Sequence, residues 1–360
     1  MRAAIFDTPG LPLTVEPVAP LALGPTDVLV RVTASGICHS DLGPARGALG
    51  DTGPTVLGHE GAGVVDTVGP NVATLRPGDR VVASWVASCD RCYWCLGGQA
   101  ETCAEWPHPA VPRFRRDDGT VVQSGLGTLG TFAEAMVVDE RALVPVATDL
   151  PDEQLALIGC GVTTGVCAVF NTAAVTPGSS VAVSGLGGVG QSVIQGARIA
   201  GAATIVAIDP VDMKRRSAIA LGATHAIDPT ATDAVEEVAA LTGGRGVDYA
   251  FEASGHPAAA KQSYTLLRRG GTLVLVGLQP ADAVPPWGMR EQLLSGKRVV
   301  GSLYGGAQVR RDFPRLVRLV EAGRLDLESL VTRRLTLDQV NEGLDLVESG
   351  EVIRSVMVMA

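Results

Sequence analysis

The sequence lacks the features that bring a protein to nucleic acid or to a membrane. Its 360 residues carry a formal net charge of −9 and no basic run, whereas binding to nucleic acid or anionic lipid needs a basic surface that displaces counterions. The N-terminus, MRAAIFDTPGLPL, has no uninterrupted apolar core like that of a signal peptide. We expect no segment to reach the roughly twenty apolar residues that span a bilayer. We therefore expect a cytoplasmic protein that acts on small molecules, without nucleic acid or membrane partners.

Aromatic residues are also scarce, at 4%, so we expect most of them to be needed for packing. The rest of the composition is that of a globular protein, with 46% hydrophobic and 19% charged residues, and the 44 glycines and 22 prolines follow no repeat. Single hydrophobic cores stop growing at about 250–300 residues. A chain of 360 residues is therefore expected to form two domains with separate cores.

Cysteine, in contrast, is concentrated, because four of the seven cysteines lie in the sixteen residues SCDRCYWCLGGQAETC. Cys89, Cys92, Cys95 and Cys103 have the spacing C-x2-C-x2-C-x7-C, which lets one loop hold four thiolates around one ion. Clustered cysteines of a reducing compartment are more often metal ligands than disulfides. We predict a structural zinc ion, because four thiolates leave no coordination position for a substrate. An iron–sulfur cluster is the alternative, since the first three spacings also fit one.

A second group of metal ligands is spread over three distant motifs. They are GICHSD with Cys38, LGHEGAG with His59 and Glu60, and IGCGVTTG with Cys160. Each motif alone is weak evidence, because a lone buried cysteine usually belongs to a core. Together, two thiolates and one imidazole form a ligand set that leaves a fourth zinc position open to water or substrate. We predict an open, catalytic metal site, and we assign Cys167 in GVCAVF to the core.

The middle of the chain has a different pattern, SVAVSGLGGVGQSVIQGARIAGAATIVAID. An apolar strand leads into the glycine fingerprint Gly185, Gly187 and Gly190, and a helix and a second strand follow. In such a βαβ unit the first glycine makes the tight turn, the second lets a pyrophosphate approach, and the third lets helix and strand pack. The helix N-terminus stabilises the phosphate charge. We therefore predict a dinucleotide site at these glycines, with Gly188 also part of it.

Asp209 ends the second strand, about twenty residues after the fingerprint. A carboxylate there hydrogen-bonds both ribose hydroxyls and repels a 2′-phosphate, which favours NAD over NADP. Lys214, Arg215 and Arg216 follow closely, and cations so near could accommodate that phosphate. With the carboxylate in place we predict NAD, and we include Lys214 among the cofactor-binding residues.

The strand patterns differ between the two halves of the chain. After the fingerprint, HAID, VDYAFEASG, GTLVLVG and RVVGSLYGG alternate with helical segments, which predicts a doubly wound parallel sheet. Before it, short strands broken by glycine and proline predict an irregular, largely antiparallel β domain, to which the last stretch of the chain returns. The predicted boundaries are 1–160 for the catalytic domain, with the metal lobe at 89–103, 161–303 for the coenzyme domain, and 304–360 for the return.

These motifs, in this order and over essentially the whole chain, resemble those of the zinc-dependent medium-chain alcohol dehydrogenases. The resemblance rests on GICHSD, GHE, the four-cysteine lobe, GCGVTTG, GLGGVG with Asp209, and NEGLDLVESGEVIR. It implies an α/β protein with a GroES-like irregular β catalytic domain and a Rossmann coenzyme domain. It also implies two zinc ions per subunit, NAD(H) as cofactor, and a homodimer, or a tetramer, joined at the edge strands of the nucleotide-binding sheets.

The resemblance further implies roles for residues near the predicted catalytic zinc. Cys38, His59 and Cys160 would hold the ion, and Glu60 would be a carboxylate that can transiently approach it. Asp41 would accept the hydrogen bond of His59 and set its tautomer. These residues would therefore form the metal centre and its support.

By the same resemblance, Ser40 would pass the proton of the alcohol outward, although several family members carry a terminal His where this chain has Gly43. His39, which we also group with the catalytic residues, and Arg354 are similar in position to the pyrophosphate ligands of the family. Other residues would line the nicotinamide and substrate pockets. They are Thr164, Val189, Val276, Ser302 and Tyr304 for the nicotinamide, and Leu49, Trp85, Phe132, Ala133, Leu278 and Leu303 for the substrate.

The apolar lining favours a primary alcohol with a slender reactive end. Trp85 would narrow the zinc end, and Ala133 would leave room further out. The sequence thus predicts an NAD-dependent zinc alcohol dehydrogenase that interconverts a primary alcohol and an aldehyde. A thiol-dependent formaldehyde dehydrogenase, acting on a glutathione or mycothiol adduct, is the alternative, since Arg113, Arg115 and Arg116 could bind the carboxylates of the thiol.

Two further classes are disfavoured by particular residues. A non-catalytic nucleotide-binding protein on the same fold would be marked by the loss of a zinc ligand, and Cys38, His59 and Cys160 are all present. A reductase of activated alkenes or imines usually changes the proton relay, so Ser40 argues against it. The enzyme classes with an open zinc site therefore remain preferred.

Overall fold

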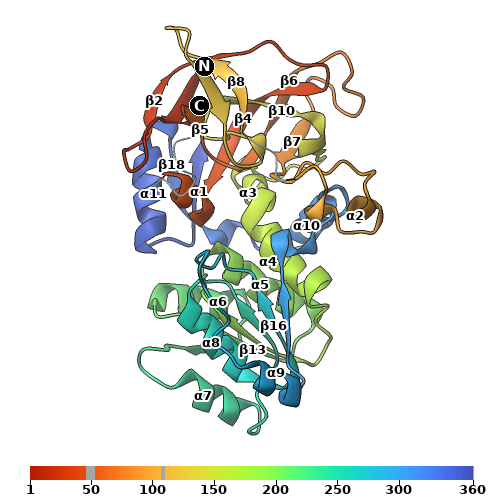
Figure 1. Cartoon of the computed structure of the whole chain (residues 1–360), viewed down its shortest axis with the longest axis vertical. Helices are drawn as coiled ribbons and strands as arrows, with labels where there is room; N and C mark the ends of the chain where they lie inside the picture. The colour runs from red at the N-terminus through yellow and green to blue at the C-terminus, as the bar shows by residue number, and fades with distance from the viewer. Residues whose placement is uncertain (46–52, 107–109, 360) are drawn as a thin grey trace. The chain divides into compact units, whose positions relative to one another are not determined.

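The computed structural model describes residues 1–45, 53–106 and 110–359. They form two compact units (Figure 1): unit 1 comprises Met1–Cys160, Gln308–Ala322 and Leu330–Ala360, and unit 2 comprises Gly161–Ala307 and Gly323–Ser329. Two short stretches, 304–307 and 323–329, thus pack in unit 2, whereas the predicted return to the first domain included them. The reason is local packing, because η6 (Leu303–Gly306) lies against α4 (Thr163–Cys167) and the Asp326 backbone bonds Gln195.

Unit 1 is built mainly from antiparallel strands. Its described residues form one sheet in the order β2-β1-β5-β9-β8-β3 and another in the order β11-β7-β6-β4-β19-β18, with β10 paired to β4. The strands are β1 (Arg2–Phe6), β2 (Thr14–Pro17), β3 (Ala19–Pro20), β4 (Asp27–Ile37), β5 (Thr55–Val56), β6 (Glu60–Val68), β7 (Arg80–Ala83), β8 (Val111–Arg115), β9 (Val121–Ser124), β10 (Ala135–Asp139), β11 (Leu143–Pro145), β18 (Val331–Leu335) and β19 (Arg354–Val358). The predicted irregular, largely antiparallel β domain is confirmed.

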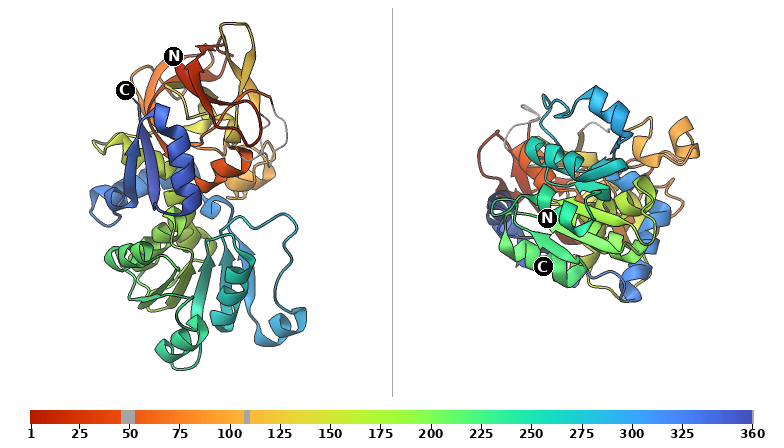
Figure 2. Two further views of the ribbon diagram at one scale, coloured as in Figure 1. Left: turned by 90° about the vertical axis from the view of Figure 1, so that its left-hand side faces the viewer. Right: turned by 90° about the horizontal axis from the view of Figure 1, so that it is seen from below.

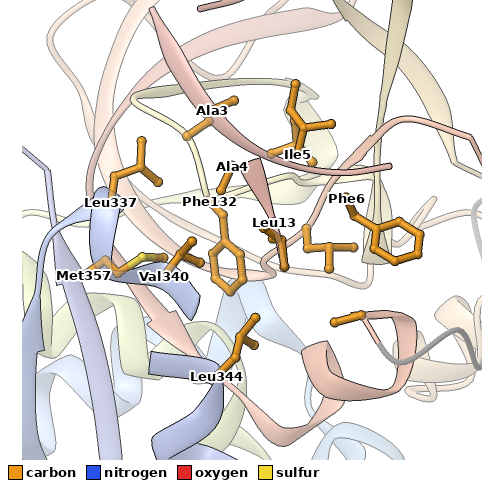
Figure 3. Close-up of a cluster of buried hydrophobic side chains, with 14 of the residues drawn as sticks. Ala3, Ala4, Ile5, Phe6, Leu13, Phe132, Leu337, Val340, Leu344 and Met357 are labelled. Atoms are coloured by element: carbon orange, nitrogen blue, oxygen red, sulfur yellow. The ribbon is translucent and has the colours of Figure 1, made fainter. Parts of the chain in front are cut away.

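Most helices of unit 1 are short, and α10 (Val309–Glu321) is longer, with 13 residues. They are α1 (His39–Ala45), α2 (Tyr93–Leu96), α3 (Asp152–Leu157), α10 (Val309–Glu321), α11 (Val340–Ser349), η1 (Ala100–Thr102), η2 (Leu126–Thr128), η3 (Glu140–Ala142), η7 (Glu328–Leu330) and η8 (Leu337–Gln339). Glu328 and Ser329 of η7 belong to unit 2. The core of unit 1 joins both ends of the chain. Figure 3 shows Phe132 surrounded by side chains of the N-terminal strand, such as Ile5, and of the C-terminal segment, such as Leu344 and Met357. Each such side chain contributes about 1.5–3 kcal/mol on burial.

Unit 2 is a parallel sheet in the strand order β14-β13-β12-β15-β16-β17. The strands are β12 (Ser180–Ser184), β13 (Thr204–Ile208), β14 (His225–Ile227), β15 (Val247–Glu252), β16 (Leu267–Leu275) and β17 (Arg298–Gly301). Its helices, which can be followed in Figure 2, include α5 (Gly188–Ala200), α6 (Asp212–Leu221), α7 (Ala234–Leu241), α8 (Pro257–Leu266) and α9 (Met289–Ser295).

The strand order of unit 2 locates its ligand site. The chain runs from β12 outward to β13 and β14, and then returns to the other side of β12 with β15. This reversal is a topological switch point, and ligands of such sheets bind at the carboxyl ends of the strands beside it. The predicted doubly wound parallel sheet is confirmed, and the glycine fingerprint lies at its switch point.

One helical segment departs from the sequence-based expectation. Asp152–Thr172, which contains α3, η4 (Ile158–Val162), α4 and η5 (Ala168–Thr172), is long and apolar enough to cross a membrane by length and composition. The expectation that no segment reaches that length was therefore wrong. However, 83% of its most apolar window is buried, as in the core helix of a water-soluble protein. Length and composition alone are therefore weak evidence for a membrane span.

Candidate metal centres and nucleotide site

Three segments of unit 1 bring four metal-binding side chains together. Cys38 directly follows β4, His59 and Glu60 stand at the start of β6, and Cys160 lies in η4, a π-helical turn. One ligand atom from each side chain lies within 4.8 Å of those of the other three, and all four residues are buried. We call this group the buried centre. The fold thus joins motifs that are far apart in the sequence.

The pairing of β4 with its neighbours explains this convergence. Gly36 of β4 lies opposite Glu60 of β6, and the other edge of this part of β4 pairs with β19, which begins at Arg354. A side chain at Gly36 would collide with the Glu60 carboxylate. Glycine at this position therefore leaves the room that Glu60 occupies beside Cys38.

The imidazole of His59 is fixed by Asp41 in the orientation that a metal ligand needs. Its Nδ1 lies 2.9 Å from Asp41 Oδ1, and Asp41 Oδ2 accepts a hydrogen bond from the Cys38 backbone N–H at 3.0 Å. The other ring nitrogen, Nε2, is buried and has no hydrogen-bond partner among the described residues. A buried nitrogen without a partner costs free energy. With the thiols of Cys38 and Cys160 close by, a metal ion is the group that fits.

The charges of the buried centre favour a cation. The pKa of the Cys38 thiol lies well below its usual value, chiefly because of its hydrogen bond with Cys160 and also because of His59. Burial lowers the pKa of His59, but the Asp41 carboxylate and the Cys38 sulfur outweigh burial and raise this pKa to about 10. The two pKa shifts favour a negatively charged Cys38 sulfur and a positively charged group beside it and the Asp41 carboxylate. A divalent metal ion supplies that charge when the ligands lose their protons, so the donor set fits zinc.

Arg354 also lies at the buried centre, where its guanidinium forms an ion pair with Glu60. Both residues are buried. The resemblance assigned Arg354 to the cofactor pyrophosphate, whereas the structure engages it with Glu60. One ligand atom of Glu60 lies within 4.8 Å of those of Cys38, His59 and Cys160 while this ion pair is formed, so the carboxylate links the Arg354 guanidinium to the donor set.

The first turn of α1 carries the residues assigned to proton transfer. Ser40 and His39 are exposed, and the Ser40 hydroxyl lies 3.8 Å from Cys38 Sγ. Gly43 is half-buried on the same helix and has no side chain to continue a proton path. A hydroxyl and an imidazole thus face solvent directly beside the buried centre.

The second cysteine set forms a closed group in unit 1, which we call the lobe (residues 89–103). The sulfur atoms of Cys89, Cys92, Cys95 and Cys103 lie within 4.8 Å of one another, and all four are free thiols. Backbone N–H groups donate to the sulfurs, from Cys89 to Cys103 at 3.3 Å and from Ala104 to Cys92 at 3.5 Å. Such donors stabilise thiolates. The arrangement is typical of a four-thiolate zinc site.

Ion pairs fasten the lobe to the rest of unit 1. Glu105 binds Arg91 at 2.8 Å and Arg141 at 2.6 Å, and Asp90 binds Arg310 of α10 at 3.1 Å. Arg141 and Arg91 lower the pKa of Glu105 by their hydrogen bonds. The lobe is thus attached mainly through charged side chains at the surface.

The glycine fingerprint leaves space for a phosphate group in unit 2. Gly185 has a φ of +88°, and a Cβ there would lie 2.7 Å from Ser254 N. A Cβ at Gly190 would collide with the Gly185 carbonyl oxygen, whereas Gly187, which precedes α5, faces open space. The glycines therefore serve the turn, the helix packing and the open phosphate position, as an N-terminal phosphate site requires. Gly188 begins α5.

Asp209 directly follows β13 and is anchored to the glycine turn. Its carboxylate accepts hydrogen bonds from the backbone N–H groups of Leu186 and Val211, each at 2.8 Å. Its own carbonyl accepts a hydrogen bond from Arg215 at 2.7 Å. The carboxylate is therefore held in place before any ribose is bound.

The cations near Asp209 are engaged by acidic residues. Arg215 pairs with Asp228 at 3.1 Å, and Arg216 pairs with Asp212 at 2.7 Å. Lys214 directly precedes both arginines in the first turn of α6. Two of the three cations that could accommodate a 2′-phosphate are thus held by carboxylates of unit 2.

The residues assigned to the nicotinamide all belong to unit 2, which contains Thr164, Val189, Val276, Ser302 and Tyr304. The Ser302 hydroxyl lies 2.9 Å from that of Thr172. Tyr304 is buried and has a φ of +51°, in the region that side chains rarely adopt. The turn η6 is therefore irregular, because the backbone angles at Tyr304 are not helical.

The residues assigned to the substrate channel have different environments. Phe132 and Ala133 are fully buried in the core of unit 1, and Ala133 pairs with Ala3 through its backbone, which gives it a packing role instead of the predicted room in a channel. Trp85 is buried and meets Trp106 edge-on, with ring centroids 5.6 Å apart. In unit 2, Leu303 is exposed and the exposed fraction of Leu278 is 87%. Leu49 lies outside the described residues.

Two buried polar residues of unit 2 are not marked by any motif. Gln191 bonds backbone carbonyls at the glycine turn, and Glu252, at the end of β15, accepts hydrogen bonds from the backbone of Ser254 and Gly255. The sequence could have indicated Gln191, because it is a polar residue on the buried face of a helix, directly after the fingerprint.

Two family models match the chain. The model described as an alcohol dehydrogenase GroES-like domain matches residues 24–149, and the model described as a zinc-binding dehydrogenase matches residues 188–322. An NDMA-dependent alcohol dehydrogenase from Amycolatopsis methanolica is 37% identical, over 99% of this chain and 98% of that protein. An S-(hydroxymethyl)glutathione dehydrogenase from Paracoccus denitrificans is also 37% identical, over 99% of each. The solved structure of benzyl alcohol dehydrogenase from Acinetobacter calcoaceticus has a TM-score of 0.93 at 31% identity, covering 100% of this chain and 99% of that one.

Proposed function

Because the chain belongs to the zinc-dependent medium-chain alcohol dehydrogenases, we propose that it interconverts a primary alcohol and its aldehyde, with NAD as the partner in hydride transfer. The relatives reported above are all named as dehydrogenases, of an alcohol or of S-(hydroxymethyl)glutathione, and such enzymes exchange an alcohol for a carbonyl group. The observation that carries the proposal is the donor set of Cys38, His59 and Cys160, in which His59 Nε2 has no partner among the described residues. An open zinc position is what this reaction needs.

We assign one zinc ion to Cys38, His59 and Cys160, and a second to the four cysteines of the lobe. Zinc in the buried centre supplies Lewis acidity toward a substrate oxygen. Asp41 directs His59 Nε2 toward the ligand set, because it accepts the proton on Nδ1. Glu60 forms an ion pair with Arg354, so its carboxylate neutralises the guanidinium charge beside the buried centre.

Ser40 is the side chain that we assign to proton transfer. Its hydroxyl is adjacent to Cys38 and exposed, so it can take the proton of a substrate hydroxyl and release it outward. Because Gly43 offers no imidazole, we propose that the proton passes from Ser40 to water. His39, exposed beside it, is the group we assign to the cofactor phosphate.

We propose NAD rather than NADP as the cofactor. Bound NAD supplies the nicotinamide ring that accepts or returns the hydride. The Asp209 carboxylate, fixed by two backbone N–H groups, would meet a 2′-phosphate with like charge. Arg215 and Arg216, which could offset that charge, are engaged by Asp228 and Asp212.

We also propose a homodimer formed through β17. This strand stands at the end of the unit 2 sheet and pairs with β16 on its other side, so a row of backbone groups is left to bond a second copy. The preceding helix, α9, exposes Met289, Leu293 and Leu294. Burying these side chains together with the strand would supply an apolar interface.

A thiol-adduct substrate is the second candidate, because one relative is named S-(hydroxymethyl)glutathione dehydrogenase. The arginines suggested for this role are mostly engaged within unit 1. Arg113 pairs with Asp27 at 2.7 Å, and Arg116 pairs with Asp7 at 2.6 Å, which leaves the exposed Arg115. We therefore prefer a plain primary alcohol, as in the structural neighbour named benzyl alcohol dehydrogenase.

The proposal is tested by Cys160→Ser, with Cys167→Ser as the matched control. Both cysteines are buried in the same helical segment, but Cys167 lies outside the donor set. We expect Cys160→Ser to lose turnover and one zinc ion while it still binds NADH, and Cys167→Ser to keep both zinc ions and turnover. Turnover by Cys160→Ser at the wild-type rate contradicts the assignment.

Initial rates then identify the substrate class. Primary, secondary and benzylic alcohols are compared with NAD, NADP and NDMA, each with and without glutathione or mycothiol. We expect primary alcohols and NAD to give the highest kcat/KM without a thiol. Formaldehyde oxidation that requires an added thiol selects the second candidate.

A further inference from the structure

Gln191 links the glycine turn of unit 2 to the helix that follows Asp209. Its exposed fraction is 0%, and its backbone N–H closes the first turn of α5 on the Gly187 carbonyl at 2.9 Å. Its side-chain Nε2 donates to the Leu186 carbonyl at 3.2 Å and to the Lys214 carbonyl at 2.8 Å. One buried amide therefore ties the turn to the first turn of α6.

The two carbonyl acceptors determine which way this amide faces. In the opposite orientation, Oε1 would stand against two carbonyl oxygens, so Nε2 has to face them. Oε1 then remains buried without a hydrogen-bond partner among the residues that the structure describes. An unpaired buried acceptor costs free energy, and an apolar side chain of similar length would avoid that cost. Packing alone therefore does not require an amide at Gln191, and what the amide contributes is its pair of hydrogen bonds to the Leu186 and Lys214 carbonyls.

The contact with Leu186 controls the direction of the next amide. The Leu186 carbonyl and the Gly187 N–H belong to one planar, trans peptide unit, so they point in opposite directions. Gln191 holds this carbonyl, and Asp209 holds the N–H of the same residue at 2.8 Å. The Gly187 N–H is therefore directed away from Gln191, at the residue whose Cα faces open space.

We infer that Gln191 is a positioning residue that orients the Gly187 N–H for the pyrophosphate of the dinucleotide. The inference rests on the proposed NAD site. Gln191 acts through the Leu186 peptide, and through Lys214 it also holds α6 against the turn. The phosphate turn is thereby ordered before the cofactor arrives, so binding does not have to order it.

The test compares two glutamines of the same helix. Gln191→Met removes both side-chain hydrogen bonds and keeps the length of the side chain. Gln195→Met is the matched control, because Gln195 also has an exposed fraction of 0% but bonds the N–H and the carbonyl of Asp326, at 2.7 Å and 2.8 Å. We expect the Kd for NADH, measured by nicotinamide fluorescence, to rise about tenfold in Gln191→Met and less than about twofold in Gln195→Met.

Thermal unfolding without cofactor should show the reverse order. Gln195→Met removes an amide whose oxygen and nitrogen are both paired, whereas Gln191→Met also removes an unpaired buried oxygen. We therefore expect Gln195→Met to lower the Tm more. A common loss of NADH affinity in both variants, in proportion to their Tm values, contradicts the inference, because it indicates a structural role alone.

Two truncated ligands identify the part of the cofactor that is affected. By calorimetry, the affinity of Gln191→Met for ADP-ribose should fall about as much as that for NADH, while its affinity for adenosine should change less than about twofold. Equal losses for adenosine and ADP-ribose overturn the inference. If Gln191→Met does not fold, Gln191→Leu replaces it, since its side chain is also uncharged and cannot donate to the two carbonyls, and the same results are expected.

The outcome for the wild-type protein separates this inference from the proposed cofactor. If the wild-type protein does not bind NADH, the NAD site and the inference both fail. If the wild-type protein and Gln191→Met bind NADH equally, only the role of Gln191 fails.

Discussion

In the lobe, four thiols come from sixteen consecutive residues, whereas in the buried centre two thiols, an imidazole and a carboxylate come from three distant motifs. Three of the four lobe cysteines are half-buried, and their surroundings are turns and surface ion pairs. The buried centre is framed instead by β4, β6 and β19, whose pairing involves Glu60 but not Cys38, His59 or Cys160.

This difference shows how each centre depends on its metal. The lobe has few apolar contacts of its own, since Tyr93 and Leu96 of α2 are exposed, so its folding should depend on the ion. The buried centre is supported by sheet pairing and by the Asp41 and Arg354 contacts. Its folding should survive loss of the metal, and its chemistry should not.

The largest expected effect comes from removing one ligand of each centre. We expect Cys103→Ser to unfold the lobe and lower the free energy of unfolding by at least about 3 kcal/mol, a fraction of the roughly 10 kcal/mol that structural zinc supplies in small domains. Cys160→Ser should lower it much less while turnover is lost. Zinc analysis and thermal unfolding of both variants test this. Equal destabilisation by the two substitutions would show that the centres do not differ in this way.

A second contrast concerns the ion pairs of the two centres. Arg354→Met leaves the buried Glu60 carboxylate without its guanidinium, which should cost about 3–5 kcal/mol of unfolding free energy. Arg310→Gln breaks the exposed Asp90 pair of the lobe and should cost about 1 kcal/mol or less. Denaturant unfolding measures both values. Similar costs for both substitutions would place the Arg354–Glu60 pair in a more solvated environment than the structure shows.

Asp41→Asn tests how strongly the support of His59 matters. The amide removes the charge that fixes the imidazole, so zinc affinity and turnover should each fall about 10–100-fold. Competition with a chelating dye and initial rates measure these losses. Asp66→Asn is the control, because Asp66 is exposed on β6 and bonds Thr67. A zinc affinity unchanged in Asp41→Asn would separate Asp41 from the metal centre.

The smallest expected effect is at the attachment of the lobe. Arg141 binds Glu105 and Asp139, and both carboxyl groups have lowered pKa values. Stability from a lowered carboxyl pKa is present above the unfolded value and is lost as the pH falls through the folded value. We expect Arg141→Gln to lower the Tm by about 1 °C at pH 7, and the difference from the wild type to shrink below pH 4. A difference that grows in acid would have the wrong sign.

Features that are local in the sequence were predicted best. The spacing of the lobe cysteines and the glycine fingerprint each describe one short segment, and the strand patterns were enough to identify both domain types. The boundaries of the C-terminal segment that returns to unit 1 were harder to predict, because residues 323–329 pack in unit 2 through Asp326 and Gln195. Nothing in the composition of that short segment distinguishes the two units.

Contacts that depend on strand pairing were not predictable in the same way. The Arg354–Glu60 pair requires β19 and β6 to flank β4, and this order cannot be obtained from either motif alone. Ala133 was assigned to a substrate channel, yet its place beside β1 puts it in the core. Gln191 was missed because the fingerprint describes glycines and not the side chain that holds their turn.

The most direct test of the account is anomalous diffraction from crystals of the protein at the zinc absorption edge. The account predicts two peaks per chain. One should lie about 2.3 Å from the sulfurs of Cys38 and Cys160 and about 2.0–2.1 Å from His59 Nε2, and the other should lie about 2.3 Å from the four lobe sulfurs. A single peak in the lobe, or a peak in the buried centre that lacks the bond to His59 Nε2, would contradict it.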